Sequence, residues 1–314
     1  MRFNKLDLNL LVALDALLSE RSISRAAERV NLSQSAMSNA LARLRDYFGD
    51  DLLIQVGRKM ELTARGEGLA DPVRDVLVRV EANISTQPAF LPAESTRVFR
   101  LLVSDYTVST LMPYVLTRVY EAAPGIRIDL RPQVAHPERA LERADADMLI
   151  IPKEYCSSAH PAEVLLEEDF CCVLWKEAPL AGGLLTREDY LGAGHIVVLP
   201  AQGQPAVEDG FIKQLGVTRR VDVTTFSFAS PAQMVVGTHR IATMHRRLAR
   251  QAQRCEPIVI RDVPLPMPVM KQTVQWHTHR TSDAGLRWLR EILKESVIAM
   301  DRSTASEHPE NISG

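Results

Sequence analysis

The sequence lacks the features that secreted, membrane-spanning and metal-dependent proteins need. It has only 4 cysteines in 314 residues, and Cys156, Cys171, Cys172 and Cys255 do not have the spacing of metal ligands. No apolar run approaches the ~20 residues of a membrane-spanning helix, and the first residues do not resemble a secretory signal. We therefore predict a cytoplasmic protein with reduced thiols, no metal and no membrane contact.

Charge of one sign and aromatic side chains are also scarce. The formal net charge is -2, and aromatic residues make up 5 % of the chain. A chain this close to neutral is not a basic protein that coats nucleic acid, so any DNA contact must come from a locally basic surface. A length of 314 residues is enough for two or three domains, each with its own core.

The N-terminal residues predict three helices. Leucines recur at helical spacing over residues 6–18, which indicates a first helix with one apolar face. Ser22 is a plausible N-cap of a second helix, in which Ala26 and Ala27 allow a neighbour to approach closely. Ser33 caps the third helix after a short turn, so the segment has the pattern of a helix-turn-helix.

The third helix has one apolar and one polar face. Its apolar residues are Met37, Leu41, Leu44 and Phe48. Short polar side chains at a helix N-terminus suit the major groove of DNA, where Gln and Asn pair with adenine and Arg with guanine. A merely solvated helix face would show similar residues. The candidate DNA contacts on this helix are Ser33, Gln34, Ser35, Ser38, Asn39 and Arg43.

A β-hairpin follows the third helix. Residues 51–56 and 60–63 have strand character and flank Gly57-Arg58-Lys59, which places two cations at the tip. Arg58 and Lys59 are therefore candidates for contact with phosphates or the minor groove. Together, residues 1–63 predict a winged helix-turn-helix.

A long helix and a hinge occupy residues 64–92. An apolar stripe about 30 Å long, at ~1.5 Å per residue, predicts that this helix pairs with its copy in a second chain. Two copies would hold two reading helices at a fixed separation, so we expect the operator to be an interrupted inverted repeat. Pro88 and Pro92 mark the hinge. The stripe consists of Leu69, Val73, Val76, Leu77, Val80 and Ile84.

Strands and helices alternate over residues 93–302, which predicts α/β lobes with parallel sheets. We expect one lobe to comprise residues 93–163 and 268–302, and the other residues 164–267, with a polar tail at 303–314. Among the expected elements are a single helix over residues 107–122 and a strand over residues 165–175.

Ligands bind beyond the carboxyl ends of parallel strands, which places an effector site between the lobes. Ser104 and Thr107 are candidates for binding a carboxylate at a helix N-terminus, although ordinary helix capping explains them equally well. Tyr106, His136 and Phe228 are candidates for contact with an aromatic ring. The complete set of candidate effector residues is Ser104, Tyr106, Thr107, His136, Gln204, Ser227 and Phe228.

These motifs resemble the LysR-type transcriptional regulators. The resemblance rests on Ala26-Ala27, the Ser-Gln-x-Ala-x-Ser pattern at residues 33–38, and the wing with Arg58, Leu62-Thr63 and Gly66. The opening segment is especially similar to the nodulation-regulator (NodD-like) branch, and His277 after Trp276 is similar to the nodulation and aromatic-degradation branch. The sequence departs from the family at Ser35, Asn39 and His245, where Pro, Arg and Pro are common.

The resemblance implies a two-lobed effector domain like that of periplasmic binding proteins. It also implies a homodimer or homotetramer on double-stranded promoter DNA, activating or repressing transcription, with RNA polymerase as a partner of an activator. The effector would be a flavonoid or another aromatic molecule. We predict no cofactor, no catalytic residues and no enzyme activity, because the sequence has neither a phosphate-binding glycine loop nor a zinc signature.

Two other functions fit parts of the sequence. An enzyme could use Cys171 or Cys172 with His195 or His245 as a nucleophile pair. Alternatively, a small-molecule-binding module could use its helix-turn-helix for protein contacts only. Alanine at Gln34 and Arg58 separates these functions from DNA reading, because only a DNA reader would lose promoter affinity.

Overall fold

The computed structural model describes residues 6–57, 59–84, 90–200 and 206–306, with backbone alone at 81–84 and 304–306. The chain forms two compact units. The N-terminal unit covers residues 1–88 together with 142–144, and the C-terminal unit covers residues 89–141 and 145–314. No helix among the described residues is both long and apolar enough to cross a membrane.

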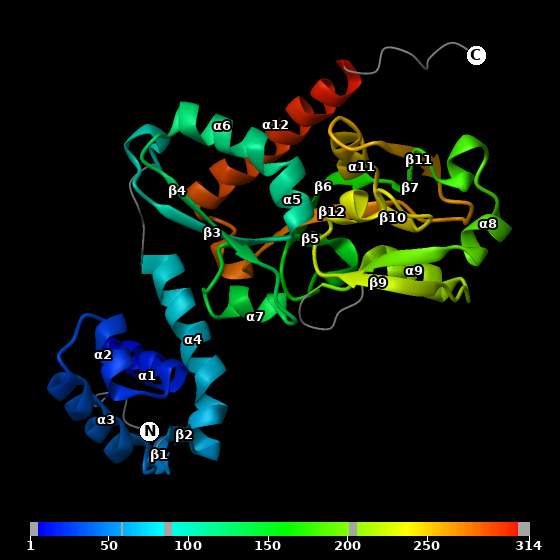
Figure 1. Ribbon diagram of the computed structural model, residues 1–314. Coiled ribbons are helices and arrows are strands. Elements are labelled where there is room, and N and C mark those ends of the chain that lie inside the picture. The colour runs from blue at the N-terminus through cyan, green and yellow to red at the C-terminus, as the bar shows by residue number, and fades with distance from the viewer. Residues whose placement is uncertain (1–5, 58, 85–89, 201–205, 307–314) are drawn as a thin grey trace. The chain divides into compact units, whose positions relative to one another are not determined.

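The N-terminal unit contains four helices and one hairpin among its described residues (Figure 1). The predicted N-caps Ser22 and Ser33 are confirmed, since their hydroxyls accept hydrogen bonds from Arg25 N–H and Ala36 N–H. The elements are α1 (Leu8–Glu20), α2 (Ile23–Arg29), α3 (Gln34–Phe48), β1 (Leu53–Val56), β2 (Lys59–Leu62) and α4 (Ala64–Ile84).

Small and branched side chains fill the core of this unit. Ala26 and Ala27 of α2 are buried, which lets α2 lie close to its neighbours, and Met37 and Leu44 of α3 are also buried, as their spacing predicted. Leu52 is buried beside the wing.

The apolar stripe of α4 is shared between two faces. Val73 is buried in the core of the N-terminal unit, and Leu69 and Leu77 pack against that core. Arg74 of α4 donates to Asp15 of α1 over 2.7 Å, and both side chains are largely buried. These three residues of the stripe therefore pack within the unit, and the pairing of α4 with a second chain stays a prediction. Val76, which is 42 % exposed, remains available to a partner.

A close backbone approach explains the glycine at position 66. A Cβ atom there would lie 2.4 Å from the Leu52 carbonyl oxygen, so a larger residue would force the wing away from α4. The Thr63 hydroxyl caps α4 by accepting from Gly66 N–H over 3.0 Å. In the hairpin, Val56 pairs with Lys59. Lys59 is therefore the first residue of β2 and does not lie at the tip, contrary to expectation.

The C-terminal unit contains two lobes, each built on a five-stranded sheet (Figure 1). In lobe I the strand order is β4-β3-β5-β12-β6; β4, β3 and β5 are parallel, and β12 is antiparallel to both of its neighbours. The elements of lobe I are β3 (Val98–Val103), α5 (Asp105–Thr110), α6 (Met112–Ala122), β4 (Arg127–Pro132), α7 (Pro137–Glu142), β5 (Met148–Pro152), β6 (Ala162–Glu168), β12 (Met270–Trp276) and α12 (Ala284–Ser306).

Lobe II has the strand order β11-β7-β10-β8-β9, with β10, β8 and β9 parallel and β7 antiparallel to both of its neighbours. The predicted two-lobed α/β architecture is confirmed, whereas wholly parallel sheets are not. The elements of lobe II are β7 (Phe170–Trp175), α8 (Arg187–Gly192), β8 (Gly194–Val198), α9 (Val207–Gln214), β9 (Arg220–Thr225), α10 (Pro231–Met234), β10 (Ile241–His245), α11 (Arg246–Gln253) and β11 (Ile258–Asp262).

Two elements that were predicted as continuous are divided. The helix over residues 107–122 is divided into α5 and α6 at Leu111, because Pro113 in the first turn of α6 has no N–H to donate to the preceding turn. The strand over residues 165–175 is divided at Asp169 into β6 and β7, which belong to different sheets. The chain therefore crosses from lobe I to lobe II at Asp169.

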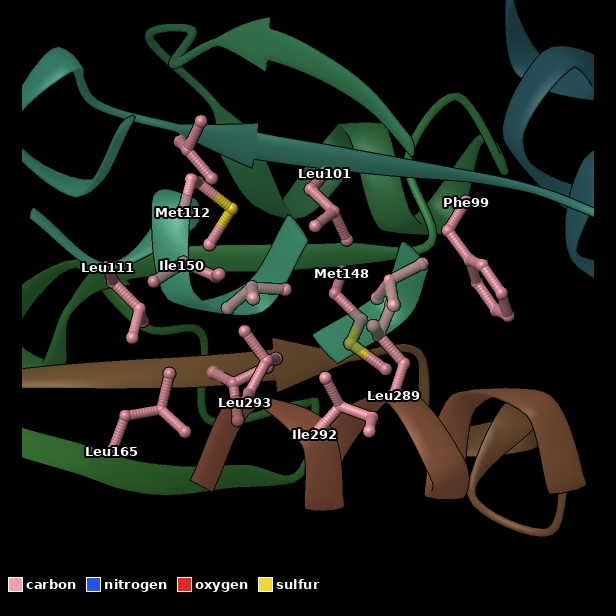
Figure 2. Packing of buried hydrophobic residues seen from close by; sticks show 14 of the residues in the cluster. Phe99, Leu101, Leu111, Met112, Met148, Ile150, Leu165, Leu289, Ile292 and Leu293 are labelled. Carbon is pink, nitrogen blue, oxygen red and sulfur yellow. The ribbon is translucent and has the colours of Figure 1, made fainter. Parts of the chain in front are cut away.

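The main core of lobe I lies between its sheet and the helices α6 and α12. Phe99, Leu101 and Val103 alternate along β3 and face this core, whereas Leu102 belongs to a smaller cluster that includes Leu141 of α7. Figure 2 shows side chains of α12 pointing toward those of β5. This packing holds the sheet in place, and with it the carboxyl ends of the strands β3, β4 and β5.

Candidate nucleic-acid interface and ligand cavity

The polar face of α3 is exposed along its length, but its side chains differ in whether they already make hydrogen bonds within the protein. The hydroxyls of Ser33 and Ser35 lie 3.0 Å apart, and Ser38 donates to the Gln34 carbonyl oxygen over 2.9 Å. The side chains of Gln34 and Asn39 make no hydrogen bond to any described residue. These two amides are therefore the side chains best able to reach base edges.

The cations predicted to contact DNA are in three different situations. Arg43 on α3 lies 3.5 Å from the Asp7 carboxylate, and both side chains are exposed. Lys59 is exposed at the start of β2. Arg58 lies outside the described residues. The Arg45 guanidinium, which was not predicted to matter, donates to the carbonyls of Asp51 and Leu53 and so fixes the wing to α3.

A cavity lies between the two lobes, at the carboxyl ends of their parallel strands. It encloses about 670 Å³ of space, part of which is open to solvent. Its walls are largely apolar and include Val134, Ile151, Val207 and Met270. Its polar and aromatic lining comes from both lobes: Ser104, Tyr106, Gln133, Tyr155 and Gln272 from lobe I, and Glu208, Phe228 and His245 from lobe II.

Three of the seven candidate effector residues line this cavity, namely Ser104, Tyr106 and Phe228. Thr107 lies behind the wall and accepts a hydrogen bond from Gln272 Nε2 over 3.0 Å. His136 does not line the cavity; its side chain is 61 % exposed and lies 3.4 Å from Glu138. Gln204 lies outside the described residues.

Ser227 contributes to a contact between the lobes and does not line the cavity. Its hydroxyl donates to Asp105 Oδ2 over 2.6 Å, and the Ala229 N–H donates to the same oxygen over 3.2 Å. Asp105 belongs to lobe I and both donors to lobe II. One carboxylate therefore fastens the two lobes together next to the cavity.

His245 is the centre of an aromatic cluster on the cavity wall. Its ring stacks on Tyr106 at a centroid distance of 4.3 Å, and the rings of Phe170 and Phe228 lie at 5.2 and 5.3 Å. Burial lowers the pKa of His245 to about 3, so the ring is neutral. Its Nδ1 atom is buried and has no hydrogen-bond partner among the described residues.

Glu208 and Gln272 are among the cavity residues that the sequence analysis missed. Glu208 is 2 % exposed and Gln272 is 1 % exposed, and one side-chain oxygen of each has no hydrogen-bond partner among the described residues. Burial raises the pKa of Glu208 to about 7, against the opposing effects of its own backbone N–H and of Arg219. The position of Glu208 shortly after the carboxyl end of β8 was a usable signal, because that is where ligands bind.

A buried polar network connects the cavity wall to α12. The Tyr106 hydroxyl donates to Glu168, which also accepts from Arg247 Nη1 over 2.7 Å. Arg247 Nη2 in turn donates to Asp301 of α12 over 2.8 Å. Glu168 lies just before the crossing at Asp169, so this network joins both lobes.

The thiols do not form a nucleophile pair with histidine. Cys171 and Cys172 lie in the middle of lobe II in different core clusters, as the alternation of side chains along a strand predicted. Burial raises the pKa of the Cys171 thiol to about 12, and His195 Nε2 is hydrogen-bonded to the Tyr190 carbonyl oxygen over 2.7 Å. Within the described parts of the chain, no cluster of His, Cys, Asp and Glu is arranged to hold a metal ion.

Two family descriptions match most of the chain. "Bacterial regulatory helix-turn-helix protein, lysR family" matches residues 8–67, and "LysR substrate binding domain" matches residues 92–297. Nodulation protein D 2 from Rhizobium leguminosarum bv. phaseoli is 40 % identical over 306 residues, which cover 97 % of this chain and 96 % of the relative. Nodulation protein D 2 from Bradyrhizobium diazoefficiens is 41 % identical over 302 residues, covering 96 % and 91 %.

Solved structures share the fold. A probable transcriptional regulator from Pseudomonas aeruginosa is 27 % identical with a TM-score of 0.65, covering 93 % of this chain and 98 % of its own. A full-length OxyR variant from the same organism is 18 % identical with a TM-score of 0.73, covering 93 % and 94 %. CbnR in complex with its target DNA is 14 % identical with a TM-score of 0.59, covering 93 % and 100 %.

Proposed function

The chain belongs to the LysR family of bacterial transcriptional regulators, and from this premise we propose how it works. As a dimer or tetramer it reads an interrupted inverted repeat in promoter DNA, and a small aromatic effector bound between the two lobes controls it. Residues 1–63 read DNA, residues 64–92 join the copies and residues 93–302 sense the effector. Where the protein activates transcription, RNA polymerase is its further partner.

The observation that carries the proposal is the set of unpaired polar atoms in the cavity wall. Glu208 Oε2, His245 Nδ1 and Gln272 Oε1 are buried and have no partner among the described residues. A buried polar atom without a partner costs about 1–3 kcal/mol. A ligand that supplies hydrogen bonds offsets this cost, and the rings of Tyr106 and Phe228 beside these atoms suit an aromatic one.

The effector proposal is tested by the melting temperature of the full chain with a panel of phenols, flavonoids and aromatic acids. We expect at least one compound to stabilise the natural protein. Phe228→Leu should weaken this stabilisation, because Phe228 lines the cavity. The matched control is Phe226→Leu, since Phe226 is 76 % exposed and does not line the cavity. Failure of the whole panel would remove the aromatic effector from the proposal.

The reading proposal is tested by promoter affinity, measured at fixed salt for the substitution at Gln34 and over a series of salt concentrations for the substitution at Arg58. Gln34→Ala removes a free amide from the reading face and should cost about 1–3 kcal/mol, the worth of one good base contact. Arg58→Ala should reduce the slope of log promoter affinity against log salt concentration by about one, the effect of losing one phosphate contact. Gln214→Ala makes the same chemical change on an exposed residue of α9 and is the matched control. Equal affinities of the natural protein and Gln34→Ala would contradict base reading by this residue.

A further inference from the structure

We propose that Glu208 sets the charge preference of the cavity between the lobes. The carboxyl group accepts a hydrogen bond from a neutral, hydroxyl-bearing aromatic ligand and rejects the carboxylate counterpart of the same ring. This inference rests on the proposed function, since it concerns the same cavity. It reverses the expectation that Ser104 and Thr107 hold a carboxylate.

The described lining of the cavity offers no cation to a ligand carboxylate. Among the described residues that line it, Glu208 is the one acid, and none is lysine or arginine. The nearby cation Arg219 is already bound to Asp209 over 2.6 Å. Glu168, by contrast, is a buried acid with an ion pair to Arg247. A ligand carboxylate would therefore bring a second negative group into a space that offers it no cation.

Because Glu208 is buried, the hydrogen bonding of its carboxyl group depends on the groups that a ligand brings. The side chain is 2 % exposed, and its Oε2 atom faces no donor among the described residues. Burial, and after it the charge of Glu208, raises the pKa of Tyr155 to about 12, so this phenol beside Glu208 stays neutral. A hydroxyl donor from a ligand satisfies Oε2 without adding charge.

The side chain of Gln272 also presents an acceptor to the cavity. Gln272 Nε2 donates to the Thr107 hydroxyl and to the Ile150 carbonyl oxygen, which can only accept. The amide orientation is therefore fixed, and the unpaired Oε1 atom is an acceptor that needs a donor. At the start of α5, Asp105 already occupies the first turn with a negative charge. A second anion there would be repelled.

The test measures ligand binding to the full chain at about pH 8, where a carboxyl group with a pKa near 7 is largely ionised. The ligands are sets of aromatic compounds of increasing size, each as the hydroxyl, carboxylate and amine counterpart of one ring skeleton. For the natural protein we expect the hydroxyl member to bind at least about tenfold more tightly than the carboxylate member.

Glu208→Gln keeps the size of the side chain and removes its charge. We expect it to reduce the preference for hydroxyl over carboxylate by about tenfold or more, mainly because the carboxylate member now binds. Glu208→Leu should shift the preference in the same direction, and melting without ligand confirms that both variants fold. Glu188→Gln is the matched control, because it makes the same chemical change at an exposed residue of α8 that does not line the cavity. Its preference should equal that of the natural protein.

The outcomes separate this inference from the proposed function. An equal preference in the natural protein and Glu208→Gln overturns the role of Glu208 and leaves the effector cavity standing. Tighter binding of the amine or the carboxylate member by the natural protein overturns the preference for a neutral ligand. If no compound binds the natural protein, the effector proposal falls as well.

Discussion

The network behind Tyr106 leads to a quantitative prediction about stability. Arg247→Met removes the guanidinium that neutralises Glu168, whose side chain is 1 % exposed, while Arg247 itself is 20 % exposed. Breaking a buried ion pair by removing one partner costs about 3–5 kcal/mol. Glu168 would keep its hydrogen bonds from the Tyr106 hydroxyl and from the backbone N–H at position 247. We therefore expect a loss near the lower end, about 3 kcal/mol.

The assay is urea unfolding of the full chain followed by tryptophan fluorescence. All three tryptophans, Trp175, Trp276 and Trp288, lie in the C-terminal unit, so the signal reports that unit alone. Arg118→Met is the matched control. Arg118 also pairs with an acid on α12, Glu295, but both side chains are exposed. Its loss should cost about 1 kcal/mol or less.

A second substitution tests the physical reason. If the cost comes from an unpaired buried charge, adding Glu168→Gln to Arg247→Met should recover about 1–2 kcal/mol, because the amide carries no charge. The reasoning is refuted if Arg247→Met costs less than about 1 kcal/mol. It is also refuted if the double variant is no more stable than Arg247→Met.

Three further predictions concern the wing, the cavity and the contact between the lobes. Gly66→Ala should destabilise the N-terminal unit by about 1–3 kcal/mol in circular dichroism melts, whereas Gly68→Ala, with open space around its Cβ, should be neutral or stabilising. Because burial raises the pKa of Glu208 from 4.5 to about 7, its stability penalty is absent below about pH 4.5 and complete above about pH 7. Melting at about pH 5 and pH 8 should show the natural protein losing more stability with rising pH than Glu208→Gln does; equal losses would contradict the shift. Asp105→Ala should speed hydrogen exchange at the Ala229 amide by about tenfold. Unchanged exchange would contradict the role of this carboxylate in holding the two lobes together.

The sequence was most informative where local rules determine structure. Ser22 and Ser33 were identifiable as N-caps because a hydroxyl before an apolar helix can satisfy its first N–H groups. The buried face of α3 followed from the spacing of Met37, Leu41 and Leu44. The buried strands of both lobes were also recognisable, since short apolar runs between turns are typical of covered sheets.

The sequence was least informative where distant segments decide the outcome. The acidic run at residues 167–169 interrupts the apolar residues around Asp169, but only the pairing with distant strands places β6 and β7 in different sheets. Glu208 reads as an ordinary residue in the first turn of a helix, yet its side chain is buried at a cavity that residues of both lobes line. His136 shows the converse error: it follows a strand end as expected, yet its side chain is mostly exposed.

The place of β12 in lobe I has a consequence for how the protein is made. This strand comes near the end of the chain but lies between β5 and β6, so it links them in the sheet order of the described strands. Domains fold as units while the ribosome works, beginning with the N-terminal one. The DNA-reading helices are therefore finished long before the sensor, and lobe I can close only after residue 276 has left the ribosome. A prematurely terminated chain would carry a complete DNA-binding domain without a working effector domain.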